Sequence, residues 1–152
     1  MKWLIRIAGV GILVFAGWWL WQRIFVTDEQ RIQRQISSMA RAVETGNLLK
    51  LEAGIAQDYS DVFGFDKSTV LVAVRSFRAQ QDGVLILISD LKITVEPDHQ
   101  RAQAVFIAKI LAKAKGSLAD SELRTDRFRL AFRKTDQGWQ MTRAESPQLK
   151  FD

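Results

Sequence analysis

The stretch from Val84 to Lys115 contains two apolar segments whose periodicity differs from that of the preceding chain. The first reads Val84-Leu-Ile-Leu-Ile-Ser-Asp-Leu-Lys-Ile-Thr-Val95, and the second reads Arg101-Ala-Gln-Ala-Val-Phe-Ile-Ala-Lys-Ile-Leu-Ala-Lys-Ala-Lys115. Alternate residues are small or apolar, which is the period of a β-strand. One face of the first strand is predicted to carry Leu85, Leu87, Leu91, Ile93 and Val95. One face of the second is predicted to carry Ala102, Ala104, Phe106, Ala108, Ile110 and Ala112.

Two further strands are predicted to complete an antiparallel meander. Between Leu123 and Lys134, the residues Phe128, Leu130 and Phe132 alternate with Arg127, Arg129 and Arg133. Asp136-Gln-Gly138 is typical of a tight turn, and residues 139–144 are predicted to form the last strand. Four consecutive strands joined by short turns indicate a single antiparallel sheet.

The segment before these strands has helical periodicity. Thr27 and Gln30 form a capping-box pattern that begins a helix ending at Gly46. A shorter helix is predicted from Asn47 to Ala56, and Asp66 is predicted to cap a third helix ending near Gln81, before a turn at Asp82-Gly83. The sequence thus predicts an α+β domain over residues 27–146, with three helices packed on one face of a curved four-stranded sheet, and an irregular tail over residues 147–152.

The first 26 residues are predicted to form a transmembrane anchor. An apolar run from Ile7 to Trp21 is preceded by Lys2 and Arg6, and Trp3, Trp18, Trp19 and Trp21 lie where aromatic residues meet membrane interfaces. The bulky residues at the end of the run argue against a cleaved signal peptide. We expect a single-pass protein of the inner or plasma membrane with its C-terminal domain outside.

Two arrangements of the junction are open at this point. Thr27 either caps a separate helix or lies inside a continuous rod that runs from the membrane to Gly46. The rod would hold the domain stiffly at a short distance from the bilayer, whereas a break at Thr27 would not.

Composition narrows the classes of function. The chain carries a net charge of +5, but Lys2, Arg6 and Arg23 precede the first acid, and the rest of the chain holds 19 basic and 17 acidic residues. This balance argues against nucleic-acid binding. The absence of cysteine excludes disulfides, thiolate metal sites and a cysteine nucleophile. A single histidine excludes a histidine pair that binds zinc, which leaves only carboxylate sites for a metal ion, and no acid-rich loop has the spacing of metal ligands. No phosphate-binding glycine loop is found either, so neither a metal nor a cofactor is expected.

The order of these elements resembles the nuclear transport factor 2-like (NTF2-like) superfamily, a cystatin-like cone. The resemblance rests on Asp58-Tyr-Ser-Asp-Val-Phe-Gly64 before the Asp66 helix, on Glu96-Pro-Asp-His-Gln-Arg-Ala-Gln-Ala-Val105, and on Phe132-Arg-Lys-Thr-Asp-Gln-Gly-Trp-Gln-Met141. It implies a pocket between helices and sheet and frequent dimerisation through the outer sheet face. The predicted pocket-lining residues are Tyr59, Phe63, Phe77, Phe106, Phe128, Phe132 and Trp139. The superfamily includes isomerases, dehydratases, binding proteins and assembly subunits, so it does not imply one function.

The face of the central strands opposite the predicted core is unusually apolar. Ile86, Ile88, Val105, Ile107 and Leu111 are predicted to lie there and to form an interface, which fits a homodimer. Basic residues accompany them, Arg127, Arg129 and Arg133 on one strand and Lys109, Lys113 and Lys115 on another. They indicate either an ordinary solvated face or a contact with anionic headgroups or an acidic partner.

No convincing catalytic group is found in the sequence. Asp58, Tyr59 and Asp61 form the nearest approach to an acid/base cluster, but acids before a glycine turn usually cap the backbone or face water. His99 follows Pro97-Asp98 and is expected to be exposed in a turn. We therefore predict no catalytic residue.

The resulting prediction is a non-catalytic, membrane-anchored scaffold or assembly component of a bacterial-type membrane complex. In architecture it resembles the inner-membrane subunits of type IV secretion systems. The alternative is a protein that binds a small apolar ligand in the cone, or an isomerase or dehydratase that uses the same pocket. An open pocket that contains a buried carboxylate with a shifted pKa would favour this alternative, and a pocket filled by Phe and Trp rings would favour the scaffold.

Overall fold

A computed structural model describes residues 26–118 and 121–146 of the chain. Apart from Val26, the predicted anchor with Trp3, Trp18, Trp19 and Trp21 lies outside these residues, and so does the predicted tail. Within the described residues, no helix is both long enough and apolar enough to cross a membrane.

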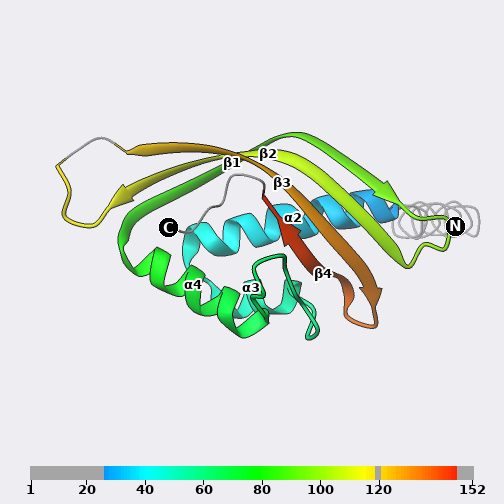
Figure 1. Cartoon of the computed structure of the whole chain (residues 1–152). Coiled ribbons are helices and arrows are strands. Elements are labelled where there is room, and N and C mark those ends of the chain that lie inside the picture. The colour runs from blue at the N-terminus through cyan, green and yellow to red at the C-terminus, as the bar shows by residue number, and fades with distance from the viewer. Residues whose placement is uncertain (1–25, 119–120, 147–152) are drawn as a thin grey trace, which may run out of the picture.

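Three helices lie against the concave face of one curved sheet (Figure 1). The helices are α2 (Asp28–Thr45), α3 (Leu48–Gly54) and α4 (Lys67–Ala79). The strands are β1 (Gln81–Val95), β2 (Arg101–Ala114), β3 (Glu122–Thr135) and β4 (Gly138–Glu145). All neighbouring strands are antiparallel, in the order β1-β2-β3-β4. The predicted α+β architecture is therefore confirmed for the described residues.

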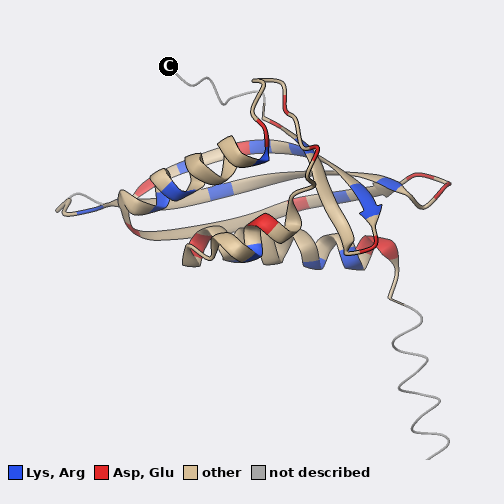
Figure 2. Ribbon diagram, turned by 90° about the horizontal axis from the view of Figure 1, so that it is seen from below, with Lys and Arg blue, Asp and Glu red and all other residues tan. Residues whose placement is uncertain are grey.

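Local capping fixes both ends of α2. Thr27 has extended dihedral angles, and its hydroxyl accepts a hydrogen bond from the Gln30 backbone N–H at 3.3 Å. Gly46 adopts the left-handed conformation at the other end, with a φ of 70°. The helix begins with the acids Asp28 and Glu29, which suit the positive end of its dipole (Figure 2). Because Thr27 is a cap, the alternative of one continuous rod through this residue is wrong.

The core lies between α2, α3 and the central and C-terminal strands. The buried apolar residues of α2 recur at helical spacing and meet the inward-facing residues of β2, β3 and β4. Three large side chains are almost completely enclosed, those of Ile32, Ile55 and Phe132. The alternation predicted for β2 is confirmed, since Ala102, Ala104, Phe106 and Ala108 are all buried.

A bulge in β1 exchanges the two faces of this strand and corrects the sequence prediction. Ser89 pairs with Ile107, but the next pair is Lys92 with Val105, so β1 contains one more residue than β2 here. Asp90 lies in this bulge with a φ of 54°. Before the bulge Ile86 and Ile88 pack against the core, whereas Leu85 and Leu87 are 48% and 50% exposed. The prediction that Ile86 and Ile88 belong to the outer face is therefore wrong.

The predicted turn at Asp82-Gly83 is also wrong. Both residues belong to β1, which begins at Gln81 directly after the helix cap Gln80. A register shift between Gln81 and Gly83 accommodates the change of direction within the strand. The chain therefore passes from α4 into the sheet without a separate loop, which brings the end of α4 next to the start of β1.

Asp28 ties the beginning of α2 to the β1–β2 turn, the end of β3 and the beginning of β4. Its carboxylate lies 3.2 Å from Trp139 Nε1, 3.3 Å from Lys134 Nζ and 3.1 Å from His99 Nδ1. Burial tends to raise the pKa of Asp28, but the hydrogen bonds from Trp139, His99 and Lys134 outweigh it and hold the pKa below its usual value. The charged form of Asp28 therefore stabilises the fold.

Replacing Asp28 with alanine is expected to lower the free energy of unfolding at neutral pH by about 1.5–3 kcal/mol, because Trp139 and Lys134 lose a charged acceptor. The wild-type contribution is fully present above the unfolded pKa of about 3.9 and is lost as the pH falls through the lower folded pKa. Urea unfolding of wild type and Asp28→Ala at several pH values measures this. The difference should shrink at acidic pH, and a constant difference would contradict the assignment.

Candidate ligand-binding pocket

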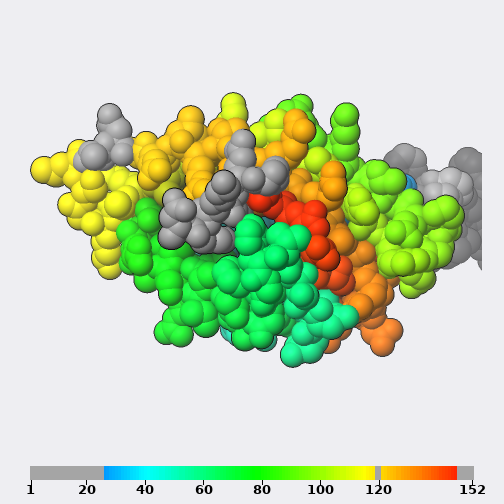
Figure 3. Space-filling model, viewed as in Figure 1, coloured from blue at the N-terminus to red at the C-terminus, as the bar shows by residue number. Residues whose placement is uncertain are grey.

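A cavity of about 750 Å³ opens between α4, the end of α2 and the first three strands. Its lining lies at the end of the sheet that carries the β2–β3 hairpin. Figure 3 shows this hairpin, in yellow, extending beyond α4. The lining is mostly apolar, and each of these helices and strands contributes at least one apolar side chain. The apolar lining consists of Val43, Ala73, Val74, Phe77, Ile86, Ile110, Ala112, Ala114 and Phe128.

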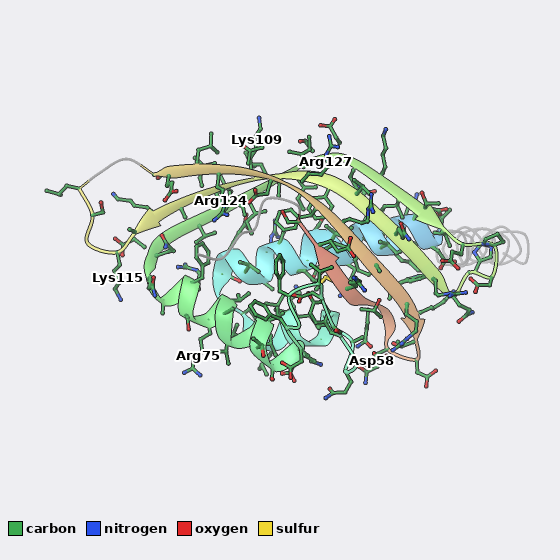
Figure 4. All side chains as sticks on the ribbon, in the orientation of Figure 1. Asp58, Arg75, Lys109, Lys115, Arg124 and Arg127 are labelled. Atoms are coloured by element: carbon green, nitrogen blue, oxygen red, sulfur yellow. The ribbon has the colours of Figure 1, made fainter. Side chains whose placement is uncertain are left out.

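Polar side chains enter this cavity mainly from one strand. Glu122, Arg124 and Asp126 are alternate residues of β3, so they share the concave side with Phe128. Arg124 Nε lies 3.1 Å from Asp126 Oδ2. Asp126 is only 3% exposed, whereas the side chain of Arg124 is about half exposed. Figure 4 shows Arg124 on the helix side of the sheet and Lys109 and Arg127 on the opposite side.

Hydrogen bonds between the walls fix the width of the cavity. Arg78 at the end of α4 donates from Nε to the Glu44 carbonyl at 3.0 Å and from a terminal nitrogen to the Gln81 carbonyl at 2.9 Å. Glu44 in turn accepts from the Ile86 backbone N–H at 2.7 Å. Because β1 is an edge strand, no further strand accepts a hydrogen bond from the Ile86 N–H, and the Glu44 carboxylate accepts it instead. Polar contacts thus join α2, α4 and β1 beside the cavity.

Two of the predicted pocket residues line the cavity. Phe77 and Phe128 do so, and Phe128 stacks on Phe106 with ring centroids 5.7 Å apart. Tyr59, Phe106, Phe132 and Trp139 instead belong to the buried core, and Phe63 is 45% exposed on the loop before α4. The buried aromatic rings therefore fill the part of the domain near α3, whereas the space beside α4 stays open.

The predicted acid/base cluster stabilises a loop away from this cavity. Asp61 accepts hydrogen bonds from the Phe63 and Phe65 backbone N–H groups at 2.8 and 2.9 Å, and Tyr59 Oη donates to it at 3.4 Å. Burial, and secondly the charge of Asp61, raise the pKa of Tyr59. Both terminal nitrogens of Arg133 donate to the two carboxylate oxygens of Asp58, at 2.8 and 2.7 Å, in a bidentate ion pair. The structural interpretation of these residues agrees with their contacts.

Neither His99 nor the acids of the described residues form a metal site. The His99 side chain is 68% exposed in the β1–β2 turn, as expected from the sequence. Among the described residues, no group of three His, Cys, Asp or Glu side chains is arranged to hold a metal ion.

Glu122, Arg124 and Asp126 are not among the predicted site residues, although the sequence contains a signal for them. Phe128, Leu130 and Phe132 were assigned to the inward face, and the same parity continues back to these three residues. Polar residues at inward positions near the end of a strand indicate a site rather than a core.

Comparisons with known proteins identify the fold. No protein-family model and no curated protein matches this sequence. Among solved structures, an NTF2-like protein with a cystatin-like fold from Novosphingobium aromaticivorans superposes with a TM-score of 0.65 and 21% identity, over 88% of this chain and 90% of that one. A candidate scytalone dehydratase from the same organism gives 0.71 and 13%, over 78% and 81%. A candidate dehydratase of the NTF2-like family from Streptomyces avermitilis gives 0.66 and 17%, over 77% and 92%. The chain thus has the NTF2-like fold predicted from its sequence.

Proposed function

We propose that the domain binds a small, mostly apolar molecule that carries a hydroxyl group. The observation that carries the proposal is an open cavity with apolar walls and one buried carboxylate, that of Asp126. Cavities of this size and character are the usual form of small-molecule sites. The names of two proteins with the same fold, both candidate dehydratases, support a small-molecule function.

The polar group of the ligand is expected to meet Asp126. A carboxylate accepts hydrogen bonds only, and it can accept more than one at each oxygen. Arg124 occupies one side of Asp126 and leads from the buried carboxylate towards the more exposed part of the cavity. A ligand hydroxyl that donates to Asp126 would form a charge-assisted hydrogen bond in an apolar surrounding, which is stronger than a neutral one. The apolar remainder would contact Phe77, Val74 and Ile110.

Binding, rather than turnover, is the function that the site supports best. The lining residues in the described part of the chain include neither histidine nor tyrosine. His99 and Tyr59, which could transfer protons, are placed outside the cavity lining. Acid/base catalysis most often uses a histidine, and the one buried carboxylate of the lining, that of Asp126, is paired with Arg124.

The membrane anchor remains part of the proposal on sequence grounds alone. Residues 1–26 would hold the ligand-binding domain at the inner or plasma membrane, with the domain outside. The open cavity supports ligand binding over the scaffold role that we predicted first. The scaffold role would need a partner in a membrane complex, and it stays a prediction.

The test compares 2-naphthol with naphthalene, two fluorescent probes that differ by one hydroxyl. Titration of the full-length protein should show that 2-naphthol binds more tightly. In Asp126→Ala this preference should fall by about ten- to hundredfold, the loss of one charged hydrogen bond. Ala112→Trp should abolish binding of both probes, because the new ring occupies the cavity.

Arg75→Gln provides the matched control, since Arg75 points away from the sheet on the exposed side of α4 (Figure 4). It should bind both probes as the wild type does. Circular dichroism verifies that each variant is folded. Equal affinity of the wild type for the two probes, or unchanged binding by a folded Ala112→Trp variant, would contradict the proposal.

A further inference from the structure

The convex face of the sheet combines exposed leucines with basic side chains. We propose that this face docks on a bilayer surface that contains anionic lipids. The outer patch is defined by the apolar residues Leu85, Leu87, Val105, Ile107, Leu111 and Leu123 and the cations Lys109, Arg127 and Arg129. It lies on the opposite side of the sheet from the cavity, and it does not depend on the proposed ligand.

The strand register places the apolar members of the outer patch side by side. Leu85 pairs with Leu111, and Leu111 pairs with Leu123, so three leucines form a row across β1, β2 and β3. Leu85 is 48% exposed and Leu123 is 59% exposed. Neighbouring leucines with this exposure are unusual on a solvated sheet face, which is normally polar. The row therefore indicates a surface that another apolar phase covers.

The cations follow this leucine row along the sheet. Lys109 lies between Leu87 and Thr125, and the next rows pair Ile107 with Arg127 and Val105 with Arg129. Figure 4 shows Lys109 and Arg127 projecting from the convex side. Among the described residues, none of these three cations forms a salt bridge. The acid nearest to Arg129 in register, Glu145, is 2.7 Å from Arg143 instead.

Charge complementarity selects an anionic lipid surface as the occupant. Basic side chains near a membrane gain about 1 kcal/mol each from anionic headgroups, and their long stems let them reach these groups while adjacent leucines enter the interface. A second copy of this chain docked on the outer patch would instead place Lys109, Arg127 and Arg129 of both molecules in one interface. Like charges placed together in this way oppose association. The homodimer predicted from the sequence thus becomes the competing outcome of the test.

The experiment uses the natural absence of cysteine from the full-length chain. A fluorophore that reports polarity is attached to Leu123→Cys, or to Arg75→Cys on the far side of the domain as the matched control. The proteins are reconstituted into vesicles of phosphatidylcholine alone or of equal parts phosphatidylcholine and phosphatidylserine. Nitroxide-labelled lipid serves as a quencher, so that burial in lipid is distinguished from other burial.

The label at position 123 should shift to the blue and be quenched in the anionic vesicles only, and the label at position 75 should do neither. Adding Arg127→Gln and Arg129→Gln should lower the ratio of docked to undocked domains by about fivefold for each charge removed. High salt should act in the same direction. Circular dichroism of the labelled proteins verifies the fold.

Four outcomes would overturn the proposal. The label at position 123 could remain in water in both kinds of vesicle, or it could be quenched equally with and without phosphatidylserine. A label protected from water but not quenched by the nitroxide lipid, together with crosslinking between two chains through Leu123→Cys, would assign the outer patch to a homodimer. Protection that required an added acidic protein would assign it to that class of partner.

Discussion

Replacing Phe132 with alanine is expected to lower the free energy of unfolding by about 3–5 kcal/mol, the usual cost of removing a buried ring. Phe132 is 1% exposed near the C-terminal end of β3, where it pairs with Ala102 on one side and Met141 on the other. It belongs to the same core cluster as residues of α2, β2 and β4, and such close-packed surroundings close only part of the space that alanine would leave. Urea unfolding followed by circular dichroism measures the change.

Phe63→Ala is the matched control for this prediction. It removes the same ring from a position that is 45% exposed, and it should therefore cost less than about 1 kcal/mol. Both phenylalanines were predicted to line the pocket, so the comparison also separates a core role from a surface role. Similar losses for the two variants would contradict the assignment of Phe132 to the rigid core.

The helices could be predicted from the sequence because their ends are determined locally. Thr27 and Asp66 each accept a hydrogen bond from the backbone three residues later, and Gly46 adopts the left-handed conformation that favours glycine. The side-chain and backbone hydrogen bonds around Asp66, chiefly those from Thr69, lower its pKa to about 2. Such contacts involve residues close in sequence, so a short window of sequence contains all the required information.

The faces of β1 could not be predicted in the same way. A bulge inserts one residue relative to the neighbouring strand, and every side chain before it changes face. Whether Asp90 forms a bulge depends on the pairing of β1 with β2, which is not a local property of the sequence. The strict alternation that we assumed therefore assigned Leu85 and Leu87 to the core and Ile86 and Ile88 to the surface.

The cavity could be predicted only in part, for a different reason. The family resemblance implied a pocket between helices and sheet, but of the predicted lining residues only Phe77 and Phe128 line it. Phe106 and Phe128 both lie on the concave side of the sheet, yet only Phe128 lines the open space. This distinction depends on the curvature of the sheet and on where α4 ends, both of which arise from tertiary packing. The alternation along β3 could predict which polar residues face inward, but it could not predict how deeply each one is buried. Asp126 is the central group of the site because it is only 3% exposed.

The bulge in β1 leads to the second large expected effect. Ile88→Asp should lower the free energy of unfolding far more than Leu87→Asp, although the two positions are adjacent. Ile88 packs against the core, so an aspartate there would place an unpaired charge among apolar groups. A change of this kind costs about 3–5 kcal/mol. Leu87 is 50% exposed on the convex face, where an aspartate remains in water. Its substitution should change the free energy of unfolding by about 0.5 kcal/mol or less.

Measuring both variants by urea unfolding tests the register of β1 as well as the two positions. Without the bulge, Leu87 would face the core together with Leu91 and Ile93, and Leu87→Asp would be the more harmful change. The sequence alternation predicts that order of effects, and the structure predicts the reverse. The reverse order should hold because the residues before Ser89 and those after Lys92 have opposite parity on the same face of the sheet. Greater destabilisation by Leu87→Asp would therefore show that β1 pairs with β2 in the unbulged register.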